Sequence, residues 1–112
     1  MAKEYYGAAD ADFRMQMAKL APEDFKAWMG LNQIPGKDHG VIPVKVREIV
    51  AVAVAHATGC PYCIESHVTK AKAAGVTKAE VAEAVLLSAA LCAGAAAAHG
   101  GLAMKFYGED EV

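Results

Sequence analysis

The stretch KVREIVAVAVAHATGCPYCIESHVTKAKAAGVTKAEVAEAV, residues 45–85, decides the fold. Its first part, from about Val44 to Thr58, is apolar nearly all round. It is followed by Gly59, and glycine adopts the left-handed backbone that closes a helix without steric cost. No segment alternates polar and apolar residues for long enough to predict a strand. We therefore expect an all-α fold.

Two more helices are predicted in the same stretch. One begins around Cys60 and ends at Gly75. Pro61 then stands at a first-turn position, where its missing N–H costs nothing. Thr77 and Glu80 form the capping-box pattern that starts the next helix.

The part of the chain before this stretch predicts two further helices and a loop. Apolar residues recur at helical spacing from Phe13 to Leu20, and a second helix begins with Pro22 in its first turn. Residues 34–43 hold two prolines and two glycines and predict a loop. Residues 1–112 are thus expected to form one small helical bundle of about five to six helices. Its aromatic side chains are expected to pack in the core: Phe13, Phe25 and Trp28.

The composition predicts an oligomer. Hydrophobic residues make up 55% of the chain and charged residues 21%. A domain of this size cannot easily bury so much apolar surface by itself, so we expect subunit interfaces. The net charge is −2, and lysine and arginine are scattered along the chain. No nucleic-acid partner is expected, because the basic residues do not cluster.

One run of residues is long enough to span a membrane. From Ala84 to Met104 the only ionisable side chains are Cys92 and His99. Alanine and glycine are weakly hydrophobic, and Gly100-Gly101 should break the last turns, so we expect a buried helix and no membrane partner. Cys92 is then expected to be a small buried residue. Met1 to Asp12 lacks the apolar segment of a secretory signal, which favours a cytoplasmic location.

Two cysteines and a histidine form the candidate catalytic site. Cys60, Cys63 and His67 stand at positions i, i+3 and i+7 of one predicted helix and therefore share a face. A helix N-terminus stabilises a thiolate, and a nearby histidine can accept the thiol proton. Glu48 lies on an otherwise apolar helix and should need a partner, which could be His67, Arg47 of another subunit or a lysine. Glu48 could instead be a first-turn acid that the helix dipole stabilises.

Two other functions are compatible with these residues. Cys60, Cys63 and His67 could bind zinc, with a fourth ligand from His56, Cys92 or His99. Structural zinc sites usually show a second closely spaced ligand pair, and this sequence has none, so we expect no metal and no cofactor. The cysteine pair could also belong to a non-enzymatic redox sensor whose disulfide alters assembly.

The spacing of Glu48, eleven residues, Cys60, two residues, Cys63, three residues and His67 resembles the alkylhydroperoxidase-D-like branch of the carboxymuconolactone decarboxylase superfamily. The likeness covers about Val44 to Ala98. It implies an all-helical homo-oligomer, commonly a trimer or hexamer. The decarboxylase branch generally lacks the cysteine pair, which argues against that activity here.

The resemblance also implies a peroxidase mechanism. Cys63 would be the thiolate that reacts with a hydroperoxide, and Cys60 would then form a disulfide with it. His67 and Glu48 would form the proton relay, and an external dithiol would reduce the disulfide. A protein disulfide is an alternative substrate. Tyr62 stands where some members have a histidine, so one relay element of those members is replaced.

Overall fold

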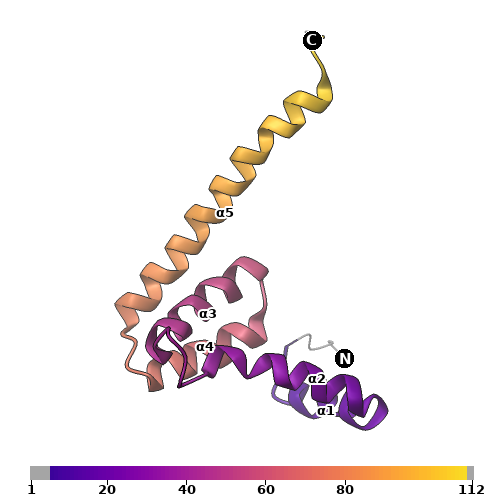
Figure 1. Cartoon of the computed structure of the whole chain (residues 1–112), viewed down its shortest axis with the longest axis vertical. Helices are drawn as coiled ribbons and strands as arrows, with labels where there is room; N and C mark the ends of the chain where they lie inside the picture. Colours follow the sequence, from indigo (N-terminus) through magenta and orange to yellow (C-terminus); the bar gives the residue numbers. More distant parts are fainter. Residues whose placement is uncertain (1–5, 111–112) are drawn as a thin grey trace. The chain divides into compact units, whose positions relative to one another are not determined.

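The computed structural model describes residues 6–110, which form five α-helices and one short 3-10 helix. Figure 1 shows them in chain order. No residue from 6 to 110 lies in a strand, so the predicted all-α fold is confirmed. The elements are α1 (Asp10–Leu20), α2 (Pro22–Asn32), η1 (Ile34–Gly36), α3 (Val44–Thr58), α4 (Pro61–Ala73) and α5 (Lys78–Tyr107).

The chain divides into two compact units, one up to Val44 and one from Lys45 onward. The single domain expected for residues 1–112 stays a prediction. The expected absence of a secretory signal rests partly on residues 1–5, which lie outside the described part of the chain.

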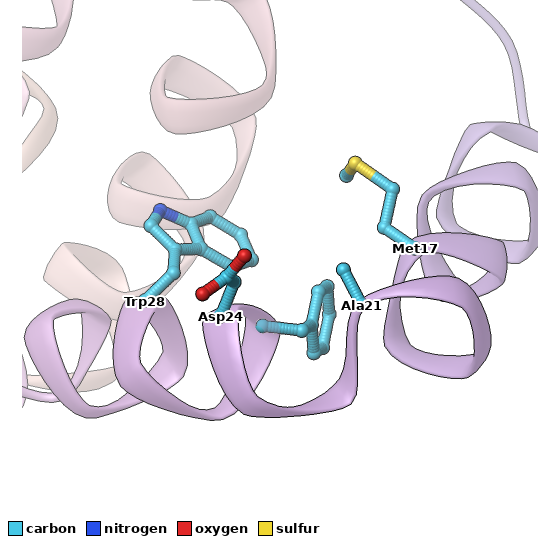
Figure 2. Close-up of a pocket in the computed structure, with 5 residues that line it drawn as sticks. Met17, Ala21, Asp24 and Trp28 are labelled. Carbon is cyan, nitrogen blue, oxygen red and sulfur yellow. The ribbon is translucent and has the colours of Figure 1, made fainter.

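In the first unit, α1 and α2 meet at Ala21 and form an open apolar pocket. Figure 2 shows Met17, Asp24 and Trp28 around it, together with Ala21. The rings of Phe25 and Trp28 lie 5.4 Å apart at a tilt of 58°. Neither helix has a fully buried residue. Within this unit the expected aromatic core does not form, because two eleven-residue helices cannot enclose side chains of this size: Phe13 and Trp28 are exposed and Phe25 is only partly buried.

The second unit holds the core of the molecule. Val52 of α3 and Ala71 of α4 are completely buried, and the start of α5 packs against them through Ala84. Small residues at these contacts let the helix backbones approach closely. Ser88 adds a polar link, because its hydroxyl donates to the carbonyl oxygen of Ala53 at 2.8 Å. Together these contacts fix α3 and α4 side by side, and that packing positions the candidate site.

The turns between these helices follow the predicted chemistry. Gly59 has a φ of +66° and joins α3 to α4, and Gly75 has a φ of +88° after α4. Thr77 and Glu80 form the capping box, with hydrogen bonds of 2.9 and 3.1 Å. The predicted ends of α3 and α4 and the predicted start of α5 are confirmed.

Helix α5 differs from the prediction in two ways. It runs through Gly100-Gly101 without a break. Each glycine costs a helix only about 1 kcal/mol relative to alanine, and the good helix formers on both sides outweigh that cost. Beyond Ser88 nearly all of its residues are exposed, and Cys92 is among them. The burial expected for this run is not found within the second unit, because no other part of that unit reaches it (Figure 1).

By length and composition, α5 is the one helix among residues 6–110 that could cross a membrane. Only 11% of its most apolar window is buried in the chain. Within the described residues of the second unit, nothing covers its exposed apolar surface.

Candidate redox site

Cys60 caps the N-terminus of α4. Its backbone is extended, and Pro61 follows at the first helical position. The Cys63 backbone N–H donates to Cys60 Sγ over 3.2 Å. This satisfies one of the N–H groups that a helix start leaves unpaired, and it places the sulfur at the positive end of the helix dipole. The sequence predicted the helix start but not this hydrogen bond.

Cys60 and Cys63 lie in disulfide position. Their Cα atoms are 5.3 Å apart, within the range of about 4.4–6.8 Å that disulfides span. Both residues are partly buried, and Tyr62 between them is exposed. The pair can therefore exchange between dithiol and disulfide without moving the backbone of α4.

Glu48 and His67 form a buried pair between α3 and α4. Glu48 Oε2 lies 2.8 Å from His67 Nδ1, and their side chains are 2% and 11% exposed. Of the partners considered for Glu48, the structure selects His67. Glu48 is not a first-turn acid, because α3 begins at Val44 and has no acidic residue in its first turn.

This contact fixes the orientation of the imidazole. An ionised carboxylate can only accept hydrogen bonds, so Nδ1 carries the proton when Glu48 is ionised. Nε2 is then the nitrogen left to accept a proton from another group. Cys63 precedes His67 by four residues, or about 6 Å of helix rise, on the same face of α4. The arrangement therefore places a base one turn beyond the cysteine pair.

The remaining histidines lie outside this arrangement. His56 Nδ1 is 2.8 Å from the Val52 carbonyl oxygen of its own helix. His39 pairs with Asp38 in an exposed segment, and His99 is exposed on α5. Within residues 6–110, no group of three or more histidine, cysteine, aspartate or glutamate residues is arranged to hold a metal ion. The zinc hypothesis therefore gains no support from the geometry.

Ser88 is a positioning residue to which the sequence analysis assigned no role. Its hydroxyl ties α5 to α3 only five residues along α3 from Glu48. A buried serine on an otherwise apolar helix face is the signal that could have identified it, because a buried hydroxyl requires a partner.

The fold and the site together define an all-helical protein with a cysteine pair at a helix N-terminus and a buried glutamate–histidine pair one turn further along. Comparison with known protein families identifies the family to which the chain belongs. The sequence model of the carboxymuconolactone decarboxylase family matches residues 22–105. The chain belongs to this family, which is part of the alkylhydroperoxidase-D-like superfamily, and the resemblance is confirmed.

Two curated relatives are also similar to the chain. "Uncharacterized protein 4 in cox locus" of Paracoccus denitrificans is 39% identical over 83 residues, covering 74% of each chain. An uncharacterized protein of Cupriavidus necator is 25% identical over 91 residues, covering 81% of this chain and 80% of its own. Neither name assigns an activity, so a proposal of function has to start from the site.

Proposed function

We propose that this protein is a dithiol oxidoreductase that reduces organic hydroperoxides through Cys60 and Cys63. The observation that carries the proposal is the position of the cysteine pair, at the start of α4 and one turn from a histidine that a buried carboxylate holds. Family membership and the disulfide position of the two cysteines support the same class of chemistry.

The reaction has two steps on the protein. The Cys63 thiolate attacks one oxygen of the hydroperoxide, the O–O bond breaks, and an alcohol leaves as Cys63 becomes a sulfenic acid. The Cys60 thiolate then attacks Cys63 Sγ, which forms the disulfide and releases water. In sum, two thiols and one hydroperoxide give one disulfide, one alcohol and one water.

His67 and Glu48 carry the proton in this scheme. His67 Nε2 accepts the thiol proton of Cys63, directly or through a water, and returns it to the departing alkoxide. The Glu48 carboxylate stabilises the imidazolium that forms in between. Tyr62 supplies no base, so His67 is the base that this scheme uses.

The proposal requires a reducing partner. An external dithiol must reduce the disulfide after each turnover, and a cytoplasmic location would provide a reducing environment. A protein disulfide could replace the hydroperoxide as oxidant, because the same cysteine pair performs both reactions.

We propose further that a second copy of the chain covers α5. The charges of this helix lie at its ends, with Lys78, Glu80 and Glu83 in the first two turns, which are net acidic, and Lys105 in the last turn. Two antiparallel α5 helices would bring Glu83 of each copy near Lys105 of the other, with the apolar middle between them. The resemblance to the family implies a trimer or hexamer. Sedimentation should then show an oligomer without detergent, whereas a monomer that floats with lipid vesicles would refute this assembly.

The peroxidase proposal is tested in a Cys92→Ser background, which removes the exposed third thiol. The reduced, metal-free protein is mixed with a small excess of cumene hydroperoxide, and thiol loss and intact mass are followed. We expect the loss of two thiols and a disulfide mass, with a sulfenic acid trapped by dimedone in Cys60→Ser and not in Cys63→Ser. Thiols that do not react would refute the peroxidase proposal, and stoichiometric zinc that survives dialysis would refute the dithiol role.

A further inference from the structure

The two sulfurs of the disulfide have different surroundings. Cys60 Sγ accepts the Cys63 backbone N–H at 3.2 Å and stands at the N-cap of α4. Cys63 stands at the third position of α4, where a side chain could accept the N–H of the N-cap residue, but the Cys60 backbone N–H donates to the Ala55 carbonyl oxygen at 3.1 Å. The backbone of α4 is therefore ready to stabilise negative charge on Cys60, whereas the N-cap N–H that could serve Cys63 is already paired.

This asymmetry matters when the disulfide is reduced. In thiol–disulfide exchange an external thiolate attacks one sulfur and the other leaves as a thiolate, and the better-stabilised thiolate leaves faster. We propose that the reducing thiol attacks Cys63 Sγ and that Cys60 is the leaving thiolate. The inference rests on the proposed dithiol function and specifies the point at which the electron donor bonds to the protein.

The exchange balances in two steps. The donor thiolate forms a bond to Cys63 Sγ as the bond between the two cysteine sulfurs breaks, which gives a mixed disulfide at Cys63 and a thiolate at Cys60. The second thiol of the dithiol donor then loses its proton and attacks the donor sulfur of the mixed disulfide. The donor leaves as a disulfide, two electrons have passed to the protein, and Cys63 is free as a thiolate.

In this scheme, bonds to the peroxide oxygen and to the donor sulfur form only at Cys63, in oxidation and in reduction alike. Cys60 attacks the sulfenic acid of Cys63 during oxidation and leaves Cys63 during reduction. A hydrogen bond to an ionised group favours that form by about ten- to a hundredfold. Only part of that advantage is expressed in the transition state of exchange, so we expect about a fivefold preference for attack at Cys63.

The test uses the wild-type chain and does not depend on peroxide. Cys92 is blocked with N-ethylmaleimide after diamide has closed the Cys60–Cys63 disulfide. Glutathione, a monothiol, is then added, and the mixture is quenched with excess isotopically labelled N-ethylmaleimide. Trypsin and chymotrypsin separate the two cysteines, because chymotrypsin cleaves after Tyr62.

We expect glutathione on the Cys63 peptide about fivefold more often than on the Cys60 peptide, and the labelled maleimide on Cys60. An equal distribution, or a preference for Cys60, would overturn the assignment. A protein that fails the peroxide assay can still pass this test, so failure of the two proposals can be distinguished.

A variant of His67 tests the cause of the preference. His67→Gln keeps an amide N–H that can donate to Glu48 and leaves the N-cap hydrogen bond untouched. If the α4 backbone sets the direction of attack, the preference for Cys63 persists in this variant while peroxide reduction slows. Loss of the preference in a folded His67→Gln protein would show that the imidazole sets the direction, and it would overturn the inference.

Discussion

The substitution Glu48→Gln tests whether the buried carboxylate acts through His67. Glu48 is 2% exposed and its Oε2 lies 2.8 Å from His67 Nδ1. Glutamine keeps the size of the side chain and an oxygen that can accept the Nδ1–H, so the contact persists as a neutral hydrogen bond. A hydrogen bond to a charged group contributes about 1.5–3 kcal/mol and a neutral one about 0.5–1.5 kcal/mol. The imidazolium therefore loses about 1–2 kcal/mol of stabilisation.

This loss raises the barrier of any step in which His67 takes up a proton. A barrier increase of about 1–2 kcal/mol slows the step by about 5- to 30-fold. The assay is the stopped-flow rate of thiol loss with cumene hydroperoxide at pH 7, in the Cys92→Ser background. Glu65→Gln is the matched control, because Glu65 is an exposed carboxylate on the same helix as His67. Its rate should stay within a factor of two of the parent protein.

Glutamine is preferred to alanine at position 48 for a physical reason. Removing one partner of a buried ion pair destabilises a protein by about 3–5 kcal/mol, and a small helical unit could unfold at that cost. The melting temperature and circular dichroism of Glu48→Gln should therefore be measured beside its rate. A folded Glu48→Gln protein that reacts as fast as the Glu65→Gln control would refute the relay.

Three further predictions concern the scaffold. The Thr77 backbone N–H donates to Glu80 and holds the pKa of that carboxyl below its ordinary value of 4.5. The ionised Glu80 therefore stabilises the folded protein above pH 4.5, and this stabilisation is lost as the pH falls through the lowered pKa. In urea titrations, Glu80→Gln should therefore be less stable than wild type at pH 7, and the difference should shrink below pH 4.5. Ser88→Ala should lower the free energy of unfolding by about 1 kcal/mol, because it removes a buried hydrogen bond; an unchanged urea midpoint would contradict this. Gly59→Ala should lower the free energy of unfolding by about 1 kcal/mol, because Gly59 has a φ of +66°. Gly30→Ala is the control: a Cβ at this position in α2 meets no atom within 4 Å, so the variant should not be destabilised. Equal melting temperatures for the two variants would show that the left-handed turn carries no strain.

The sequence predicted the parts of the fold that depend on local chemistry. The bounds of α3 follow from its apolar run and Gly59, and the start of α5 follows from the capping pair at Thr77 and Glu80. Turn and cap preferences act within four residues, so they can be read without knowledge of the tertiary structure.

The predictions that failed depend on which surfaces meet. Cys92 and Phe13 were expected to be buried and are exposed, because hydrophobic character does not determine where a covering surface is found. The partner of Glu48 could not be chosen from spacing, since His67 lies 19 residues away on another helix. Only the packing of α3 against α4 identifies the pair.

This difference divides the site into two halves with different requirements. The sulfur half is local, because Cys60, Pro61 and Cys63 form the first turn of α4 and its N-cap hydrogen bond. The proton half is tertiary, because Glu48 meets His67 only when α3 packs against α4 around Val52. In the proposed function, disulfide exchange would need chiefly the first half, whereas peroxide reduction would need both. Loosening the core should therefore impair peroxide reduction before it impairs dithiol exchange, and the two activities report on different levels of the same structure.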